Sequence, residues 1–191
     1  MAGAVDGTRL APYRFIPETH HRRNRQLVDA RTGSLLGRRA LVSGSAAGLA
    51  STLALALCGR IERRSASAAL NGPSQWLWGI AEGRRRRTNV RNTGVGFLIH
   101  QAMSVAWATA YEAVSRRDRY STGPAAHLRN GALLAALAFA VDYGMTPRRL
   151  RPGFEHHLRP ASMFAVYSAF GLGLAAVSWL RARRCREAGG H

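Results

Sequence analysis

The stretch "ALVSGSAAGLASTLALAL", Ala40 to Leu57, decides the fold of this chain. It carries no ionisable side chain, and arginines flank it at Arg38, Arg39 and Arg60. A soluble helix needs a polar face, and only Ser, Thr and Gly could turn toward water here. Its length lies within the roughly 17–25 residues that a membrane helix needs. We therefore predict a membrane span, in preference to a buried helix of a soluble bundle.

Three further apolar segments predict three further spans, at residues 94–114, 125–145 and 161–180. The third is short unless it begins next to Pro124, since proline is favoured at the first position of a helix. Together the four segments predict an all-α, integral membrane four-helix bundle over residues 40–181. The 191 residues are enough for one ordinary domain.

The two ends of the chain are polar. Residues 1–39 contain few apolar residues and no clear period, which predicts a disordered, basic cytoplasmic leader. This leader is too long for the charged start of a cleaved signal, and Leu57 before Cys58 is too large for a lipoprotein cleavage box. The first span is therefore expected to be retained. Residues 182–191 form a short basic tail.

The formal net charge is +18, and all 28 basic residues are arginine. Arginine in an Ala- and Gly-rich chain is typical of a GC-rich bacterial genome. No aromatic-interleaved patch or recognition helix accompanies the charge, so we expect no nucleic-acid partner. The arginines beside the spans suit a bilayer with anionic headgroups, where each contributes roughly 1 kcal/mol near the surface.

The distribution of arginines also gives an orientation. The leader, the loop after the second span, and the tail together with Arg181 hold sixteen, against twelve in the two other loops. Since arginine is enriched in cytoplasmic loops, both termini are predicted to be cytoplasmic. The run Arg84-Arg85-Arg86-Arg87 narrows that difference. The expected location is the bacterial inner membrane, with multiple passes.

An interrupted apolar segment, "SASAALNGPSQWLWGIAEG", separates the first two spans at residues 65–83. Asn71-Gly72-Pro73 breaks it, so it is too short to cross a membrane. Trp76 and Trp78 suit the aromatic belt at a membrane surface. We predict a short interfacial or re-entrant helix; a soluble loop with incidental tryptophans is the alternative.

Polar residues lie on one stripe of each predicted span, because residues four, seven and eleven apart share a helix face. Antiparallel threading of four spans brings these residues into the same leaflet. The candidate polar cluster comprises His100, Asp142, Tyr167 and Thr52. An ionisable group inside a membrane is expensive and usually faces the bundle interior. Packing surfaces also use such stripes, and Gly44 and Gly48 form a close-approach motif on the first span.

The segment "RPGFEHHL", residues 151–158, follows the third span. Pro147 stops that helix and Pro152-Gly153 makes a turn, which could return the segment to the bundle. The predicted mouth of the bundle comprises Asn71, Trp76, Glu155 and His156. Asp142 could then form a structural clasp with Arg148 or Arg149, or hold a polar cavity with His100. Glu112 is expected to pair with Arg116, four residues later.

Three stretches carry a resemblance: "AALNGPSQWLWG", "GFLIHQAMSVAWATAYE" and "VDYGMTPRRLRPGFEHHL" followed by "VYSAFGLGL". Over roughly residues 40–180 the chain resembles a family of small, uncharacterised four-helix bacterial inner-membrane proteins. The resemblance implies the topology and no activity. The run of four arginines at 84–87 departs from the usual pattern of that family.

Three classes of function stay open. The first is a non-catalytic membrane or assembly component; the second is a small transporter or proton-coupled permease that uses His100 and Asp142. The third is a membrane enzyme acting on a lipid. No GxSxG, HExxH, paired-aspartate or phosphate-loop motif occurs, so we expect no catalytic residue and no cofactor. Cys58 and Cys185 form no metal pattern. Four helices leave little interior, and a homo-oligomer could supply the missing volume.

Overall fold

The computed structural model describes residues 18–117 and 123–188, and the side chains of residues 32–115 and 123–188. The described residues form helices and turns, with no strand among them. The chain divides into two compact units, Met1–Leu35 and Leu36–His191. Every contact reported below lies within the second unit.

The helix α1 (Glu18–Arg63) contains the first predicted span and begins well before it. Disorder was expected over residues 1–39, and the structure differs over 18–39, which are helical. The physical reason is that a helix, once nucleated, extends at little cost through residues such as Arg, Gln and Leu. Residues 1–17 of the predicted leader lie outside the described residues.

Three other long helices follow: α4 (Val95–Arg117), α5 (Pro124–Ala140) and α6 (Pro160–Ala188). A π-helical turn, η3 (Val141–Met145), continues α5. Within the described part of the chain, three segments are long and apolar enough to cross a membrane, namely Thr32–Arg63, Pro124–Met145 and Pro160–Ala188. The predicted second span corresponds to α4, whose 23 residues extend about 34 Å. However, α4 is not apolar enough to count among the three candidate spans named above.

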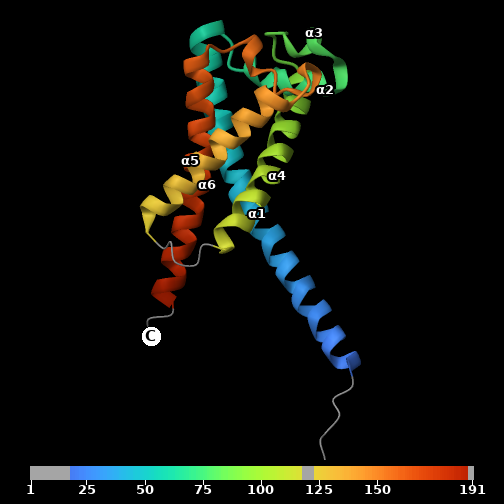
Figure 1. Cartoon of the computed structure of the whole chain (residues 1–191). Helices are drawn as coiled ribbons and strands as arrows, with labels where there is room; N and C mark the ends of the chain where they lie inside the picture. Colours follow the sequence, from blue (N-terminus) through green and yellow to red (C-terminus); the bar gives the residue numbers. More distant parts are fainter. Residues whose placement is uncertain (1–17, 118–122, 189–191) are drawn as a thin grey trace, which may run out of the picture. The chain divides into compact units, whose positions relative to one another are not determined.

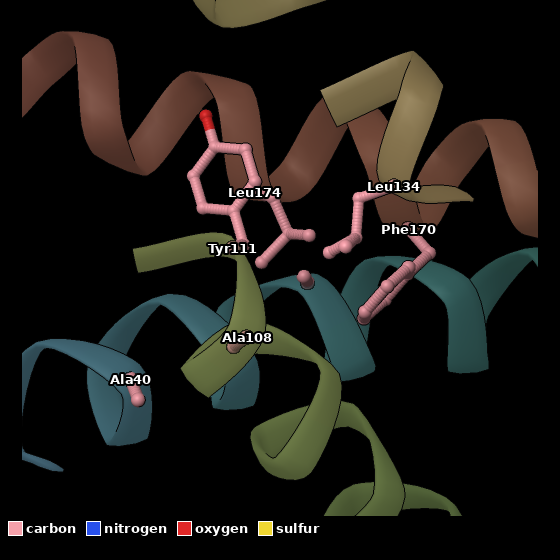
Figure 2. Packing of buried hydrophobic residues seen from close by; sticks show 7 residues of the cluster. Ala40, Ala108, Tyr111, Leu134, Phe170 and Leu174 are labelled. Atoms are coloured by element: carbon pink, nitrogen blue, oxygen red, sulfur yellow. The ribbon is translucent and has the colours of Figure 1, made fainter. Parts of the chain in front are cut away.

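The buried core draws residues from all four long helices (Figure 2). Three alanines, two aromatic residues and two leucines fill it: Ala40, Ala47, Ala108, Tyr111, Leu134, Phe170 and Leu174. Many other large aliphatic side chains point outward, with Leu53 66% exposed and Leu133 62% exposed. Alanines where helices pack closely, together with many exposed leucines, are a distribution expected where lipid surrounds the helices.

Glycines bring the helix backbones together. A Cβ on Gly44 of α1 would lie 2.6 Å from the Cα of Val105 in α4, and one on Gly48 would overlap the Gln101 side chain. Between α5 and α6, a Cβ on Gly171 would lie 2.8 Å from the carbonyl oxygen of Gly131. The Gly-x-x-x-Gly motif of the first span is therefore a packing surface against α4.

One end of the helices carries a folded cap, defined here as residues 64–94 and 146–159 (Figure 1). Its first segment holds η1 (Ala69–Ser74), α2 (Gln75–Trp78), α3 (Ile80–Gly83) and η2 (Val90–Gly94). Its second segment holds η4 (Arg148–Leu150) and η5 (Phe154–His156). The helices of the first segment are four to six residues long, too short to cross a membrane.

Candidate functional site

Asn71 is the centre of the cap's first segment. It is fully buried, and its Nδ2 donates to the carbonyl oxygens of Arg85 at 2.7 Å and Arg87 at 3.1 Å. Its Oδ1 accepts a hydrogen bond from Thr93 Oγ1 at 2.7 Å. Asn71, predicted at an open mouth, therefore lies inside the cap and fixes the arginine-rich loop.

Gln75 and Trp76 join the cap's two segments. Gln75 Nε2 and Trp76 Nε1 donate to the carbonyl oxygen of Arg151 at 2.8 and 3.1 Å. Gln75 Oε1 lies 3.1 Å from His156 Nε2, and an amide oxygen only accepts, so His156 is the donor. Where the segments cross, a Cβ on Gly153 would lie 2.8 Å from the Gly72 carbonyl oxygen. The predicted return of "RPGFEHHL" to this end of the helices agrees with these contacts.

His157 is a buried titratable group of the cap, with only 1% of its surface exposed. Its Nε2 donates to the carbonyl oxygen of Gly83 at 2.8 Å. Its Nδ1 is buried and has no hydrogen-bond partner among the described residues. Burial lowers the pKa of His157 below its usual value of 6.5. The folded cap therefore favours the neutral form of the His157 ring.

Acid is expected to destabilise the cap through His157. Because its folded pKa lies below 6.5, its contribution is fully present above that pH and is lost as the pH falls through the folded value. Hydrogen exchange of residues 64–94 and 146–159 at pH 7.5 and pH 5 measures this loss. His157→Gln keeps a donor for Gly83 without titrating, so its cap should show a smaller acid effect. An equal acid effect in wild type and variant would contradict the assignment.

Beneath the cap lies a cavity with about 60 Å³ of room for the centres of water-sized spheres. His100 of α4, Asp142 of η3 and Tyr167 of α6 all line it, as does Ser51 of α1. Three of the four residues of the predicted cluster thus line one cavity. Thr52 is the exception: its hydroxyl is buried without a hydrogen-bond partner among the described residues, and it does not line the cavity. Ser51, the preceding residue and about 100° away around the helix, lines the cavity where Thr52 was expected to lie.

Asp142 is held by a tyrosine and not by an arginine. Tyr167 Oη donates to Asp142 Oδ2 at 2.6 Å. The expected clasp with Arg148 or Arg149 does not form, because Thr146 and Pro147 are extended, with ψ of 130° and 144°, and lead the chain away. No ion pair found among the described residues involves Asp142.

His100 contacts α1 and the cap. Its Nε2 lies 2.9 Å from Ser51 Oγ, and its ring meets that of Phe154 edge-on at 5.8 Å between centroids. The Ser51 hydroxyl also lies 3.0 Å from the Ala47 carbonyl oxygen, to which it donates. A hydroxyl has one proton, so with that bond made His100 Nε2 is the donor to Ser51.

Two acidic residues differ from their predicted surroundings. Glu112 pairs with Arg181 of α6, whose Nη1 lies 3.0 Å from both carboxylate oxygens. The side chain of Arg116, its expected partner, lies outside the described side chains. The pair spans two helices because Glu112 faces the core, with 4% of its side chain exposed. Glu155, predicted at the mouth, has a buried Oε2 without a hydrogen-bond partner among the described residues.

An apolar groove of about 500 Å³ lies between α5 and α6. Leu128, Ala132, Phe139 and Phe164 are among the residues that line it. Tyr167 lines this groove as well as the cavity, and it is the only residue that the two linings share. Tyr167 therefore belongs both to the cavity beneath the cap and to an apolar groove between α5 and α6.

Sequence reasoning missed Gln75, since a glutamine beside a tryptophan gives no periodic signal. Ser51 lies on the same stripe of the first helix as Gly44 and Gly48, and His157 lies in the segment predicted to return to the bundle, but neither was singled out as a site residue. The resemblance over residues 40–180 stays a prediction. No family model, no curated protein and no solved structure matches the chain.

Proposed function

We propose that the protein is a four-span integral protein of the bacterial inner membrane that binds a small ligand, without catalysis, in the cavity beneath the cap. Three helices with the length and composition of spans support this, together with a core to which α4 contributes equally. The family resemblance of residues 40–180 points to the same topology. Cytoplasmic termini place the cap in the periplasm.

One observation carries the ligand-binding role: polar groups from three helices and a π-helical turn converge on one cavity with otherwise apolar walls. A mostly apolar pocket with a few convergent polar groups is the usual form of a small-molecule site. π-helical turns such as η3 are also frequent at functional sites. Asp142, a carboxylate without a cationic partner among the described residues, is the group that such a site would use.

Asp142→Asn tests whether this carboxylate serves binding or folding. An amide oxygen still accepts the Tyr167 hydrogen bond, while the charge, which lacks a partner, is gone. A residue that is retained for function often lowers the stability of the folded protein. We expect the unfolding free energy in detergent to change by less than about 0.5 kcal/mol or to rise. A loss as large as that caused by Glu112→Gln would make Asp142 a structural clasp and contradict the proposal.

The topology has its own test. Reporter fusions after Arg91 and after Arg159 are both expected to report the periplasm, because both residues belong to the cap or its edge at one end of the helices. A fusion within the tail after Arg183 should report the cytoplasm and is the matched control. A cytoplasmic signal at Arg91 or Arg159 would reject four spans with this orientation.

A proton-coupled permease is the second candidate, favoured by the position of Tyr167 between the cavity and the apolar groove. If the cavity and the groove were the two openings of one transport pathway, the shared residue Tyr167 would separate them. Since four helices enclose little volume, a homo-oligomer would complete such a pathway. Flux through proteoliposomes at two pH values distinguishes transport from binding alone. Nothing in the site's geometry specifically favours an enzyme acting on lipid.

A further inference from the structure

We propose that the cavity binds a small organic cation of the methylated-ammonium class; this inference rests on the ligand-binding role proposed above. Two features of the lining carry it, a wall of aromatic rings and one carboxylate. The cavity lies wholly within the second compact unit of the chain.

The aromatic wall comes from the cap and from two helices. It comprises Trp76, Trp107, Phe154, Tyr167 and Phe170. The face of an aromatic ring carries partial negative charge and attracts a cation within about 6 Å of the ring centre. Several rings around one space form the aromatic cage that recognises quaternary ammonium groups, and tryptophan is the strongest contributor.

The carboxylate of Asp142 supplies the formal charge. Tyr167 holds Oδ2, and no hydrogen bond found among the described residues uses Oδ1. A carboxylate in apolar surroundings needs a cation or a proton. No arginine lines the cavity, so the protein itself supplies no such cation at this place.

Most polar atoms of the lining are already paired. The Ser51 and His100 side chains bond to each other, and the hydroxyl of Tyr167 is used by Asp142; the indole Nε1 of Trp107 is buried without a hydrogen-bond partner among the described residues. A quaternary ammonium has no N–H, so it needs only aromatic rings and a negative charge. A metal ion is a poorer fit, since no group of three metal-binding side chains occurs among the described residues.

The size of the cavity agrees with a headgroup of this class. One water needs roughly 10–15 Å³ on the same scale, so about 60 Å³ admits about four to six non-hydrogen atoms. A tetramethylammonium or trimethylammonium group falls in that range. Such a group occurs as a free cation or as a lipid headgroup, and both present the same chemistry to Asp142.

The arginines of the cap do not preclude a cation. Those of the run 84–87 are exposed, and salt screens exposed charges beyond about 8 Å at physiological ionic strength. The groove between α5 and α6 gives an apolar approach from the bilayer, and Tyr167 is shared by its lining and that of the cavity. A cation carried on an apolar body could enter by that side.

The test compares choline with its uncharged carbon isostere, 3,3-dimethyl-1-butanol, by calorimetric titration of the purified protein in nanodiscs of phosphatidylglycerol. Choline should bind at least about tenfold more tightly than the isostere, since a desolvated cation–π contact contributes about 2 kcal/mol. Asp142→Asn should lose choline binding, and Asp142→Glu should retain it. In nanodiscs that contain phosphatidylcholine, competition would identify a lipid headgroup as the source; its absence would identify a free cation.

The aromatic wall is tested separately. Trp107→Leu is expected to weaken choline binding about tenfold. Trp78→Leu is the matched control and should bind as wild type, since Trp78 does not line the cavity. Equal binding of choline and the isostere, undiminished binding by Asp142→Asn, or no choline binding would each overturn the cation assignment. The stability of Asp142→Asn decides the proposed function independently of these results.

Discussion

Glu112→Gln is expected to destabilise the folded protein by about 3 kcal/mol, because it leaves a guanidinium without its anion inside the helix packing. Arg181 Nη1 binds both oxygens of Glu112 at 3.0 Å, and the Glu112 side chain is only 4% exposed. An amide presents one acceptor and one donor, so one of these contacts becomes repulsive. The partial exposure of Arg181, 27%, keeps the loss near the lower end for buried pairs.

Unfolding in detergent with increasing denaturing surfactant measures that loss. Glu187→Gln is the matched control, since Glu187 pairs with Arg183 four residues away and both side chains are more than half exposed. Exposed pairs of this kind contribute about 0.3–0.5 kcal/mol. If Glu112→Gln is no more damaging than Glu187→Gln, the α4–α6 pair has no part in holding the helices together.

Asn71→Asp is expected to unfold the cap while leaving the long helices formed. The change keeps the size of the side chain, but an oxygen replaces Nδ2, which donates to the carbonyl oxygens of Arg85 and Arg87. Three acceptors then face one another without a donor between them. Each buried polar group left unsatisfied costs about 1–3 kcal/mol, and the carboxylate adds the cost of a buried charge. The loss therefore reaches several kcal/mol, confined to residues 64–94 and 146–159.

Limited proteolysis in the run 84–87 reports this change, because trypsin cleaves after arginine once the backbone is free. Wild type should resist cleavage there, and Asn71→Asp should be cut rapidly with its helices intact by circular dichroism. Thr88→Val removes a single hydrogen bond at the cap's surface, to Ser67 at 2.8 Å, and is the control. Equal resistance of Asn71→Asp and wild type would show that Asn71 does not hold the cap.

Counting residues along the spans was enough to bring His100, Asp142 and Tyr167 to one cavity. That inference depended on helix rise and antiparallel threading alone, both of which the sequence determines once the spans are recognised. It failed by one residue at Thr52, where rotation around the helix matters as much as depth. It also failed for the partner of Asp142, since electrostatics favoured Arg148 or Arg149 while the extended backbone at Pro147 excluded both.

The contacts within the cap could not be predicted by counting residues along the helices. Gln75 and the carbonyl oxygens of Arg148 and Arg151 are more than seventy positions apart, and the segments that carry them have no periodic pattern. Polar residues in a loop are ordinarily read as solvated, yet Asn71 and Gln75 are fully buried. Glu112 shows the same difficulty: Arg116 was close in sequence, whereas Arg181 is close in space.

The crossing of the cap's two segments bears on how the protein is made. Residues 64–94 are synthesised long before residues 146–159, and long-range contacts form late. Until the second segment exists, the Gln75 and Trp76 donors lack their acceptor on Arg151, and Gly72 has no backbone to cover it. During biogenesis the first segment is therefore an incomplete surface, accessible to proteases, until residues 146–159 complete it.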